Sequence, residues 1–365
     1  MMDYLIEIIE GKRKGVVASV VLILLTLLAY VYMVGLKLFL LPYKLGIRKQ
    51  FRLPCPVVSV GNLTVGGTGK TPMTLRLCEL LLERGLKVVV LNRGYRGASE
   101  YGVAIVSDYK RVLLSPEQAG DEATMLAGML KGVPVVVGKD RRVSGSLAVK
   151  EFQPDLILLD DGMQFYQLHR DFEITLLLAE MPFDNGWPFP RGKMREPMTH
   201  LKRSSAVVLT RADRVTPTAL EALKSKVKRL APGRPIYEAT FRGTGLSPLM
   251  GNDRKEMAWL QGRKVGAFCA LGNPEGFREQ LMEAGAEIVH WQAFPDHHAL
   301  TMAELQGFLE QSASAGAEAV IVTDKDGVKL PPIMRPLPIY SLRARMVLQD
   351  EEEFVNFMLK AVGRA

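Results

Sequence analysis

The sequence predicts an α/β fold built on a doubly wound parallel sheet, with a second, smaller α/β domain and an N-terminal helix suited to a membrane. Continuous apolar runs alternate with helical stretches after Pro54, and a second series of such runs begins near residue 240. The segment from Gly15 to Leu36 has no charged residue. Strands that are apolar throughout, without alternation, are typical of a parallel sheet covered by helices on both faces.

The uncharged N-terminal segment is long enough to cross a bilayer. It has about 22 residues, or roughly 33 Å as a helix, against a hydrocarbon core of about 30 Å. Basic residues flank both ends, so the pattern leaves its orientation open, as well as the choice between a helix that spans the bilayer and one held in a single leaflet. A buried helix of a soluble protein is the alternative. Acidic residues ahead of the segment and the lack of a cleavage site argue against a signal peptide.

The composition is that of an ordinary globular protein with a large core. Hydrophobic residues make up 48% and charged residues 24% of the chain, which excludes disordered and fibrous classes. The net charge of +8 favours anionic partners, although a slightly basic surface explains it equally well. The three scattered cysteines form no CxxC pair, which argues against a disulfide framework or structural zinc and favours a reducing compartment.

The apolar runs divide the chain after residue 49 into two domains. We expect a membrane anchor and basic flank at 1–49, a first domain at 50–240 and a second at 241–365. Strands of the first domain are expected at 56–60, 88–91, 134–137, 156–159, 174–178 and 206–209, with a helix at 71–85 after the first strand. In the second domain we expect strands at 265–271 and 319–323, a helix at 274–284, and another opened by a capping box at Thr301.

A glycine-rich loop directly after the first expected strand is the strongest functional signal. It comprises Thr64, Val65, Gly66, Gly67, Thr68, Gly69, Lys70 and Thr71. It departs from the pattern G-x-x-x-x-G-K-[ST] only at Thr64. Glycines let backbone N–H groups close around phosphate oxygens, and the helix N-terminus adds positive charge. Lys70 is expected to reach the β- and γ-phosphates and Thr71 to hold Mg²⁺, so the loop predicts a P-loop nucleotide site rather than a plain glycine-rich turn.

Two adjacent carboxylates support the same site. Asp160 and Asp161 directly follow the apolar run 156–159. A strand that ends in aspartate after a phosphate loop is typical of a magnesium site in nucleotide-binding proteins. Many unrelated strands also end in aspartate, so this signal depends on the loop before it.

Together these motifs resemble the tetraacyldisaccharide 4′-kinases, the lipid A 4′-kinases of Gram-negative bacteria. The resemblance covers about residues 54–330. The matching strings are Val60-Gly61-Asn62-Leu63-Thr64-Val65-Gly66-Gly67-Thr68-Gly69-Lys70-Thr71-Pro72, Asn92-Arg93-Gly94-Tyr95, Gly120-Asp121-Glu122, Asp160-Asp161-Gly162-Met163-Gln164, Leu168-His169-Arg170-Asp171, Pro190-Arg191-Gly192-Lys193-Met194-Arg195-Glu196-Pro197, Gly272-Asn273-Pro274-Glu275, Phe294-Pro295-Asp296-His297-His298 and Thr323-Asp324-Lys325-Asp326-Gly327-Val328-Lys329-Leu330.

The resemblance implies a membrane enzyme that uses ATP and Mg²⁺. Such an enzyme phosphorylates the 4′-hydroxyl of a tetraacylated glucosamine disaccharide 1-phosphate at the cytoplasmic face of the inner membrane. Its partners are then the lipid A disaccharide precursor and membrane lipids, and no nucleic acid is expected. The family fold has two α/β/α domains joined by a small β linker.

The resemblance also implies the catalytic residues. Asp121 matches the family's catalytic aspartate and is our candidate base, with His297 or His298 paired to it; from the residues alone, Asp121 more simply caps a helix. Lys70 is expected to act in catalysis as well as in binding. Candidates for substrate contact or charge stabilisation are Arg93, Tyr95, Glu122, Arg142, Gln164 and Arg195.

Three positions depart from the family pattern. Phe165 stands where the family usually has histidine, Met163 replaces the usual phenylalanine, and Arg96 follows Tyr95 in place of glycine. None of these positions belongs to the phosphate loop or the carboxylates, but any role of the missing histidine does not carry over to this chain.

Two other classes are compatible with the sequence. The string Leu209-Thr210-Arg211-Ala212-Asp213 resembles a guanine-reading TKxD element with arginine for lysine, as in a membrane-associated P-loop GTPase. A nucleotide-binding regulator with an inactive site is the second alternative.

Overall fold

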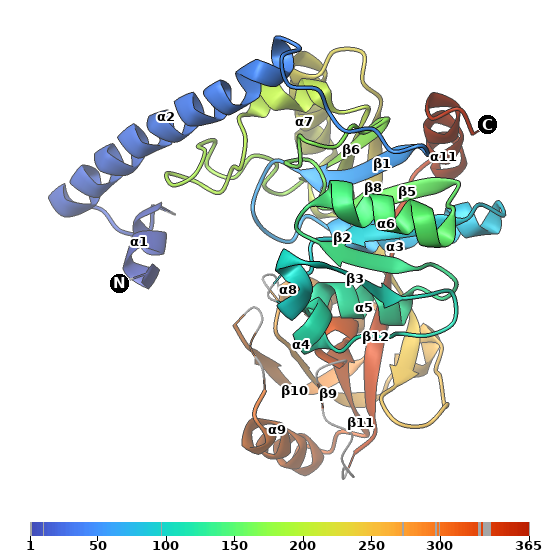
Figure 1. Ribbon diagram of the computed structural model, residues 1–365. Helices are drawn as coiled ribbons and strands as arrows, with labels where there is room; N and C mark the ends of the chain where they lie inside the picture. Colours follow the sequence, from blue (N-terminus) through green and yellow to red (C-terminus); the bar gives the residue numbers. More distant parts are fainter. Residues whose placement is uncertain are drawn as a thin grey trace. The chain divides into compact units, whose positions relative to one another are not determined.

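The computed structural model describes residues 2–9, 11–95, 97–271, 274–295, 298, 300–327, 330 and 337–364. They form two compact units: unit 1 is Met1–Thr240 with Leu348–Ala365, and unit 2 is Phe241–Val347 (Figure 1). Each is an α/β unit, as the sequence predicts.

Unit 1 is built on a sheet that is parallel except at one edge. Its strands lie in the order β8-β7-β6-β1-β5-β2-β4-β3, and only β3 pairs in antiparallel fashion, with β4. Their bounds are β1 Val57–Asn62, β2 Val88–Asn92, β3 Val103–Ser107, β4 Val135–Gly138, β5 Leu156–Asp160, β6 Phe172–Leu178, β7 Ala206–Thr210 and β8 Ile236–Pro248. The doubly wound parallel sheet predicted from the apolar runs is confirmed.

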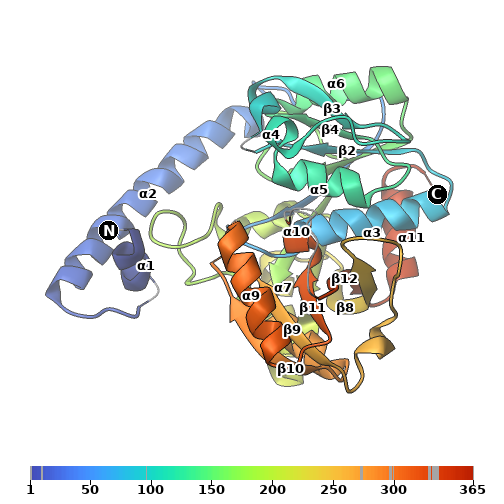
Figure 2. The same cartoon turned by 90° about the horizontal axis from the view of Figure 1, so that it is seen from below.

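Helices cover both faces of this sheet. Figure 2 shows α6 on one face of β2 and β4, with α3 and α5 on the other. Strands β1, β2, β4 and β5 are buried along their whole length, which explains why their sequences do not alternate. The helices are α3 Lys70–Glu83, α4 Pro116–Ala119, α5 Asp121–Met129, α6 Arg141–Phe152, α7 Pro217–Leu230 and α11 Glu351–Ala361, with 3₁₀ segments η1 Ala98–Tyr101, η2 Met198–Arg203 and η3 Ala212–Arg214.

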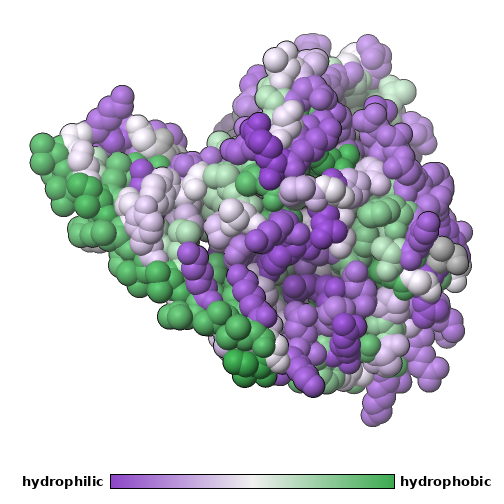
Figure 3. Space-filling model, turned by 90° about the horizontal axis from the view of Figure 1, so that it is seen from above, coloured by the Kyte–Doolittle hydropathy of each residue, from purple (hydrophilic) through white to green (hydrophobic). Residues whose placement is uncertain are grey.

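Two helices precede the sheet: α1, Met2–Ile9, and α2, Val16–Lys44. Helix α2 is long and apolar enough to cross a membrane. Most of its large side chains are exposed, and they form a hydrophobic surface along the helix (Figure 3). Its exposed aliphatic residues are Val16, Val17, Val20, Ile23, Leu24, Leu27, Leu28, Val31, Val34, Leu38 and Leu41.

The C-terminal helix differs from the sequence-based division of the chain. We expected residues 241–365 to form one domain, but α11 groups with unit 1. Phe354 lies edge-on against Tyr237, with ring centroids 4.9 Å apart, and Phe357 packs on Phe172 at 5.6 Å. The buried Arg76 donates from Nε to Glu351 at 2.7 Å. These contacts join residues far apart in the chain, so no local pattern could predict them.

Unit 2 contains a smaller parallel sheet with strand order β10-β9-β11-β12. Its strands are β9 Lys264–Cys269, β10 Glu287–Ala293, β11 Ala319–Thr323 and β12 Ile339–Leu348. Its helices are α8 Glu275–Glu283, α9 Met302–Ser314 and α10 Asp324–Gly327, with the 3₁₀ segment η4 Met257–Leu260. The capping box predicted at Thr301 is present, with Glu304 as its partner.

We predict that Phe354→Ala destabilises unit 1 by about 3–5 kcal/mol, because it leaves a cavity where a fully buried ring filled the core. Asn356→Ala on the exposed side of the same helix is the control, with an expected change below about 0.5 kcal/mol. Urea unfolding followed by circular dichroism measures both. Equal midpoints for the two variants would show that α11 contributes nothing to the core of unit 1.

Candidate active site

The phosphate loop lies between the end of β1 and the start of α3. Gly66 and Gly69 have φ of 124° and 91°, a region that favours glycine. A Cβ on Gly66 or Gly67 would meet no atom within 4 Å, so the space beside these two residues is open. Their conformation and the open space leave the backbone accessible to a ligand.

Side chains from two strands of the sheet, β1 and β7, hold the loop in place. Asn62, the last residue of β1, donates from Nδ2 to Thr68 Oγ1 at 2.8 Å. Thr210, the last residue of β7, donates from Oγ1 to the Thr68 carbonyl at 3.0 Å. Both contacts are buried, so the loop conformation is fixed by the carboxyl ends of the strands.

A later segment of the chain, residues 193–195, pairs with the first half of the loop. Val65 N–H donates to the Lys193 carbonyl at 2.7 Å, and Arg195 N–H donates to the Leu63 carbonyl at 2.7 Å. Thr64 forms an antiparallel bridge with Met194 and is buried. The departure from glycine at Thr64 therefore has a structural explanation: this position belongs to a small strand pairing.

Asp160 at the end of β5 is buried and hydrogen-bonded. It accepts from Thr74 Oγ1 at 3.1 Å and from Asn92 Nδ2 at 3.0 Å. Burial raises the pKa of Asp160 to about 6, and the charges of Asp161 and Glu122 act in the same direction. A nearby cation would stabilise the ionised form of this carboxylate.

Asp161 is held by two cations. Arg195 Nη1 donates to its two oxygens at 2.8 and 2.9 Å, and Lys70 Nζ lies 3.9 Å from Oδ1. Burial alone raises the pKa of Asp161, but Lys70 and Arg195 outweigh it, so the pKa is lowered. Asp161 is therefore ionised, and the structure brings four predicted residues together: Lys70, Asp160, Asp161 and Arg195.

Gln164 extends this network. Its side-chain Nε2 donates to the Asn62 carbonyl at 3.0 Å, and its Oε1 accepts from Arg195 Nη1 at 3.1 Å. Gln164 thus connects Arg195 to the strand that precedes the phosphate loop. In this structure its contacts orient Arg195.

Asp160 and Asp161, called the acidic pair below, also act electrostatically on Arg141, the neighbour of the predicted Arg142. Arg141 is 5% exposed, and its guanidinium lies 5.6 Å from the ring centroid of Phe165. Burial lowers the pKa of Arg141 to about 10, although the charge of Asp161 opposes this. It stays charged at neutral pH, and its Nε has no hydrogen-bond partner among the described residues.

Arg142 instead pairs with Asp140, two residues earlier. Its Nε lies 2.9 Å from Asp140 Oδ1 and its Nη2 2.5 Å from Oδ2, and its side chain is 42% exposed. Successive residues of a helix point about 100° apart, so only one of the two adjacent arginines faces the sheet. The sequence offered the pair Arg141-Arg142 after β4 but no sign of which residue points inward.

Close glycine packing brings the Arg93–Tyr95 segment against the start of α5. A Cβ on Gly120 would lie 2.6 Å from the Tyr95 carbonyl oxygen, and one on Gly97 would lie 2.5 Å from Ala119. Asp121 follows Gly120 as the first residue of α5, and it is exposed, as is Glu122. The candidate base is thus fixed beside the loop that carries Tyr95.

Arg93 and Tyr95 lie on this loop after β2. Arg93 Nε donates to Glu100 Oε1 at 2.9 Å, and its guanidinium is 5.7 Å from the centroid of the Tyr95 ring. Tyr95 is 56% exposed. Its ring therefore offers a surface to a ligand on the solvent side of the site.

The predicted histidines belong to unit 2. His298 stacks on Phe294, and its Nε2 lies 3.1 and 3.2 Å from the two oxygens of Glu304. His297 lies outside the described residues. The pairing of one of these histidines with Asp121 stays a prediction.

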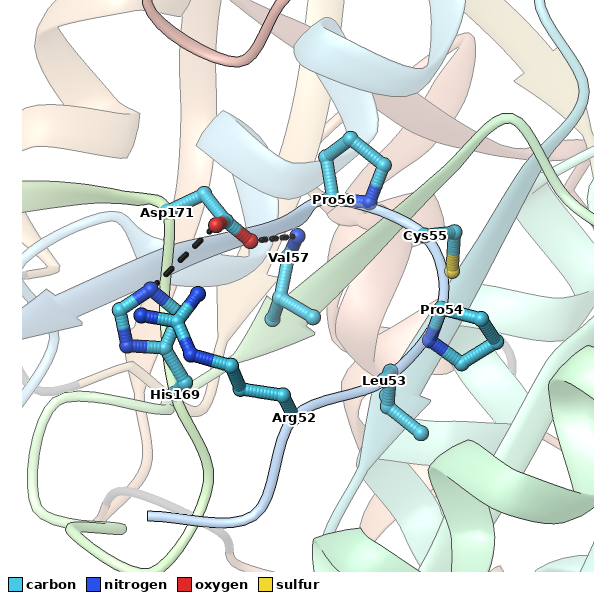
Figure 4. Close-up of a pocket in the computed structure, with 8 residues that line it drawn as sticks. All are labelled: Arg52, Leu53, Pro54, Cys55, Pro56, Val57, His169 and Asp171. Carbon is cyan, nitrogen blue, oxygen red and sulfur yellow. Dashed lines mark hydrogen bonds and ion pairs between the residues drawn. The ribbon is translucent and has the colours of Figure 1, made fainter. Parts of the chain in front are cut away.

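A separate pocket of about 210 Å³ lies at the start of β1 (Figure 4). Asp171 Oδ2 accepts from Val57 N–H at 2.8 Å, and its Oδ1 lies 3.3 Å from His169 Nε2. Arg52 and Cys55 line the same pocket. Since ligands of such sheets bind at the carboxyl ends of the strands, we assign this pocket a structural role in fixing the start of β1.

The oxygen donors of the site fit Mg²⁺. Thr71 follows Lys70 on α3 and offers a hydroxyl oxygen. The carboxylate of Asp160 contacts Thr74, and that of Asp161 lies near Lys70. Among the described residues, no three His, Cys, Asp or Glu side chains form a metal-binding cluster. Mg²⁺ is usually bound by one or two carboxylates together with nucleotide phosphates and water, so the donor set of Thr71, Asp160 and Asp161 suits this ion.

The known proteins that are similar to this chain over most of its length are named as kinases. A family model described as tetraacyldisaccharide-1-P 4′-kinase matches residues 21–363. The tetraacyldisaccharide 4′-kinase of Syntrophus aciditrophicus is 37% identical over 358 residues, covering 96% of this chain and 95% of the relative. The same-named protein of Pelobacter propionicus is 39% identical over 339 residues, covering 93% and 91%.

A solved structure has the same fold. It is described as an "apo" form of LpxK from Aquifex aeolicus in complex with ATP, and it superposes with a TM-score of 0.73 at 31% identity. The match covers 92% of this chain and 97% of that one.

The raised pKa of Asp160 predicts how stability varies with pH in the nucleotide-free protein. Between the unfolded pKa of 3.8 and the folded pKa of about 6, the unfolded state releases a proton that the folded state keeps. Stability therefore falls as pH rises, by about 1.4 kcal/mol per unit and about 3 kcal/mol in all.

Asp160→Asn removes this titration, because asparagine can accept from Asn92 and donate to Thr74. The test is the free energy of unfolding of both proteins at pH 4 and pH 7. We expect the wild type to lose about 2 kcal/mol relative to Asp160→Asn over this range. A difference that is independent of pH would contradict the raised pKa.

Proposed function

The chain belongs to the tetraacyldisaccharide 4′-kinase family, and we propose that it transfers the γ-phosphate of ATP to the 4′-hydroxyl of a tetraacylated glucosamine disaccharide 1-phosphate, a lipid A precursor. The observation that carries this proposal is the acidic pair opposite the phosphate loop, with Lys70 and Arg195 on Asp161. The reaction takes place at the cytoplasmic face of the bacterial inner membrane.

The phosphate loop binds the triphosphate of ATP. Its open backbone at Gly66 and Gly67 and the N-terminus of α3 offer N–H donors to phosphate oxygens. Lys70 at the start of α3 reaches the β- and γ-phosphates. Binding draws Lys70 from Asp161 toward the nucleotide, while Arg195 remains on Asp161.

Thr71, Asp160 and Asp161 hold Mg²⁺ in this proposal. The ion neutralises charge on the phosphates when it is bound. Asp161 is ionised by Lys70 and Arg195, and Asp160 is oriented by Thr74 and Asn92. These contacts fix both carboxylates before any ligand arrives, so little energy is lost in reorganisation.

Asp121 prepares the acceptor. Its carboxylate accepts the proton of the 4′-hydroxyl as the hydroxyl oxygen bonds to the γ-phosphorus and the bond to the β–γ bridging oxygen breaks. The exposed position of Asp121 and Glu122 at the start of α5 supports this role, since the acceptor must reach them from solvent or membrane. A histidine, His297 or His298, supports the basicity of Asp121.

Arginine side chains stabilise the charge on the transferred phosphoryl group or on the 1-phosphate of the acceptor. Arg141 supplies a buried positive charge beside the acidic pair, and Arg93 and Tyr95 flank the open side of the site. A buried cation is worth more in this role than an exposed one, because water screens it less.

Helix α2 keeps the enzyme on the membrane that contains its acceptor. A groove of about 910 Å³ beside the helix combines apolar walls with basic side chains, which suits a phosphorylated lipid in both polarity and charge. The apolar wall comes from Met33, Leu36 and Leu40, and the basic residues are Lys37, Lys44, Arg48, Lys49, Arg52, Lys202 and Arg203.

The GTPase alternative is not favoured, since the relatives are named as kinases. In the candidate guanine-reading string, Thr210 bonds to the phosphate loop, and Arg211 lies 3.5 Å from Glu180. These contacts give both residues a structural role.

We predict that the purified protein transfers labelled γ-phosphate from ATP to the disaccharide acceptor. Lys70→Ala is expected to lower kcat by at least about a hundredfold, because it removes a charge that faces the transferred group. The assay compares ATP with GTP and follows the labelled lipid. Absence of transfer, while a known enzyme of the family works in the same assay, would refute the proposed function.

The two adjacent arginines offer a matched comparison. We predict that Arg141→Ala lowers kcat/KM by at least about a hundredfold, because it removes a buried charge beside the acidic pair. Arg142→Ala is expected to change kcat/KM by less than about threefold, since its partner is Asp140 at the surface. The reverse order of effects would show that Arg142 is the functional residue.

A further inference from the structure

An aromatic loop, defined here as residues 184–192, lies along α2 (Figures 1 and 2). Trp187 meets Tyr30 edge-on, with ring centroids 5.8 Å apart, and Phe189 meets Tyr32 at 6.5 Å. Phe189 stands between Pro188 and Pro190 and is 59% exposed. The loop thus extends the exposed hydrophobic surface of α2.

These contacts place the loop on the apolar part of the helix. Lys37 is the first charged residue after the apolar run. Tyr32 and Tyr30 precede it by about 8 and 10 Å along the helix axis, at 1.5 Å per residue. If Lys37 lies among the lipid headgroups, the two tyrosines and the loop residues against them lie deeper than the headgroups.

The backbone at the tip of the loop, residues 187–192, is suited to such a place, because its N–H groups are paired or absent. Trp187 N–H donates to Asn185 Oδ1. Phe189 N–H donates to the Met194 carbonyl, and the N–H groups of Arg191 and Gly192 both donate to the Pro188 carbonyl. Pro188 and Pro190 have no N–H group. An unpaired N–H costs several kcal/mol in hydrocarbon, and the tip of this loop has none.

Charged side chains of the loop also fit a phospholipid surface. The guanidinium of Arg191 lies 5.9 Å from the centroid of the Trp187 ring, and Lys193 follows at the end of the loop. Aromatic rings with adjacent arginine or lysine are typical of the interface between acyl chains and phosphate headgroups.

We propose that the aromatic loop inserts into the interfacial zone of a phospholipid bilayer beside α2, with Trp187 and Phe189 below the level of the phosphates. The inference rests on the membrane association of α2 proposed above. The bilayer then holds the enzyme through two elements, a helix and a loop, that are far apart in the sequence.

Insertion of this loop sets the height of the active site above the membrane. Tyr32 donates from its hydroxyl to the Arg195 carbonyl at 2.7 Å, and the side chain of Arg195 binds Asp161. The adjoining residues pair with the phosphate loop. The acidic pair is therefore joined through one residue, Arg195, to the part of α2 that enters the membrane.

Depth-dependent fluorescence quenching tests the proposal on the full-length protein. The chain has three tryptophans, so Trp259→Phe with Trp291→Phe leaves Trp187 as the only reporter. The protein is reconstituted into vesicles of phosphatidylethanolamine and phosphatidylglycerol whose acyl chains carry bromine near the headgroup or near the chain end. Phosphoryl transfer confirms that each reporter protein is folded.

Two further reporters, each the only tryptophan in its chain, separate the possible outcomes. Phe189→Trp probes the tip of the loop, and Leu24→Trp probes the middle of α2. We expect bromine near the headgroup to quench the emission at positions 187 and 189 more strongly than bromine near the chain end, and the reverse order at position 24.

Quenching at position 24 together with water-like emission at 187 and 189 would overturn the insertion of the loop and leave the anchoring by α2 intact. Absence of quenching at all three positions, in a protein that still transfers phosphate, would overturn both the insertion and the membrane role of α2. Neither result contradicts the proposed kinase function, because phosphoryl transfer is measured separately.

Discussion

Two adjacent carboxylates at the end of a buried strand repel each other, and the groups of unit 1 that contact them compensate for this repulsion. Asp160 is buried, and this burial raises its pKa. Asp161 is paired with Lys70 and Arg195, and these two cations lower its pKa. The cations come from α3 and from the segment before η2. A parallel sheet is what brings the ends of these distant segments to one edge.

The order of the strands explains why the acidic pair faces the phosphate loop. Strand β1 leads into the loop, β5 ends in Asp160, and the two strands are direct neighbours, with Val60 beside Asp160. Thr210 at the end of β7 and Asn92 at the end of β2 then reach the loop and Asp160 from the strands around them. A metal ion beside the carboxylates and a triphosphate in the loop would complete the site, because each has the charge opposite to that of the protein groups it faces.

The sequence was sufficient for the parts of this arrangement that depend on local order. The phosphate loop and the acidic pair each follow a strand directly, and fully apolar strands identify the sheet. That Arg141 is buried and Arg142 is not depends on the phase of α6 against the sheet, which the sequence does not show. The pairing of Thr64 with Met194 and the packing of α11 on β8 depend on chain segments that return from far away. The edge strand β10 is only partly buried, so its sequence lacks the continuous apolar run.

The nature of the acceptor explains why the site is joined to α2. Each buried CH₂ group contributes about 0.8 kcal/mol to membrane binding, so lifting a lipid with four acyl chains out of the bilayer would cost far more than catalysis can supply. The enzyme must therefore work at the surface. Tyr32 contacts Arg195, which lies next to the residue that pairs with the phosphate loop. This contact fixes the position of the site relative to the helix.

The central claim is that the acidic pair and Thr71 form the metal–nucleotide site of a kinase. Anomalous diffraction from crystals grown with Mn²⁺ and a non-hydrolysable ATP analogue tests it most directly. The account predicts a manganese peak within bonding distance of Thr71 Oγ1 or of a carboxylate oxygen of Asp160 or Asp161, with the γ-phosphate beside Lys70. A nucleotide bound with its phosphates away from the loop, or a metal bound elsewhere in the chain, would contradict it.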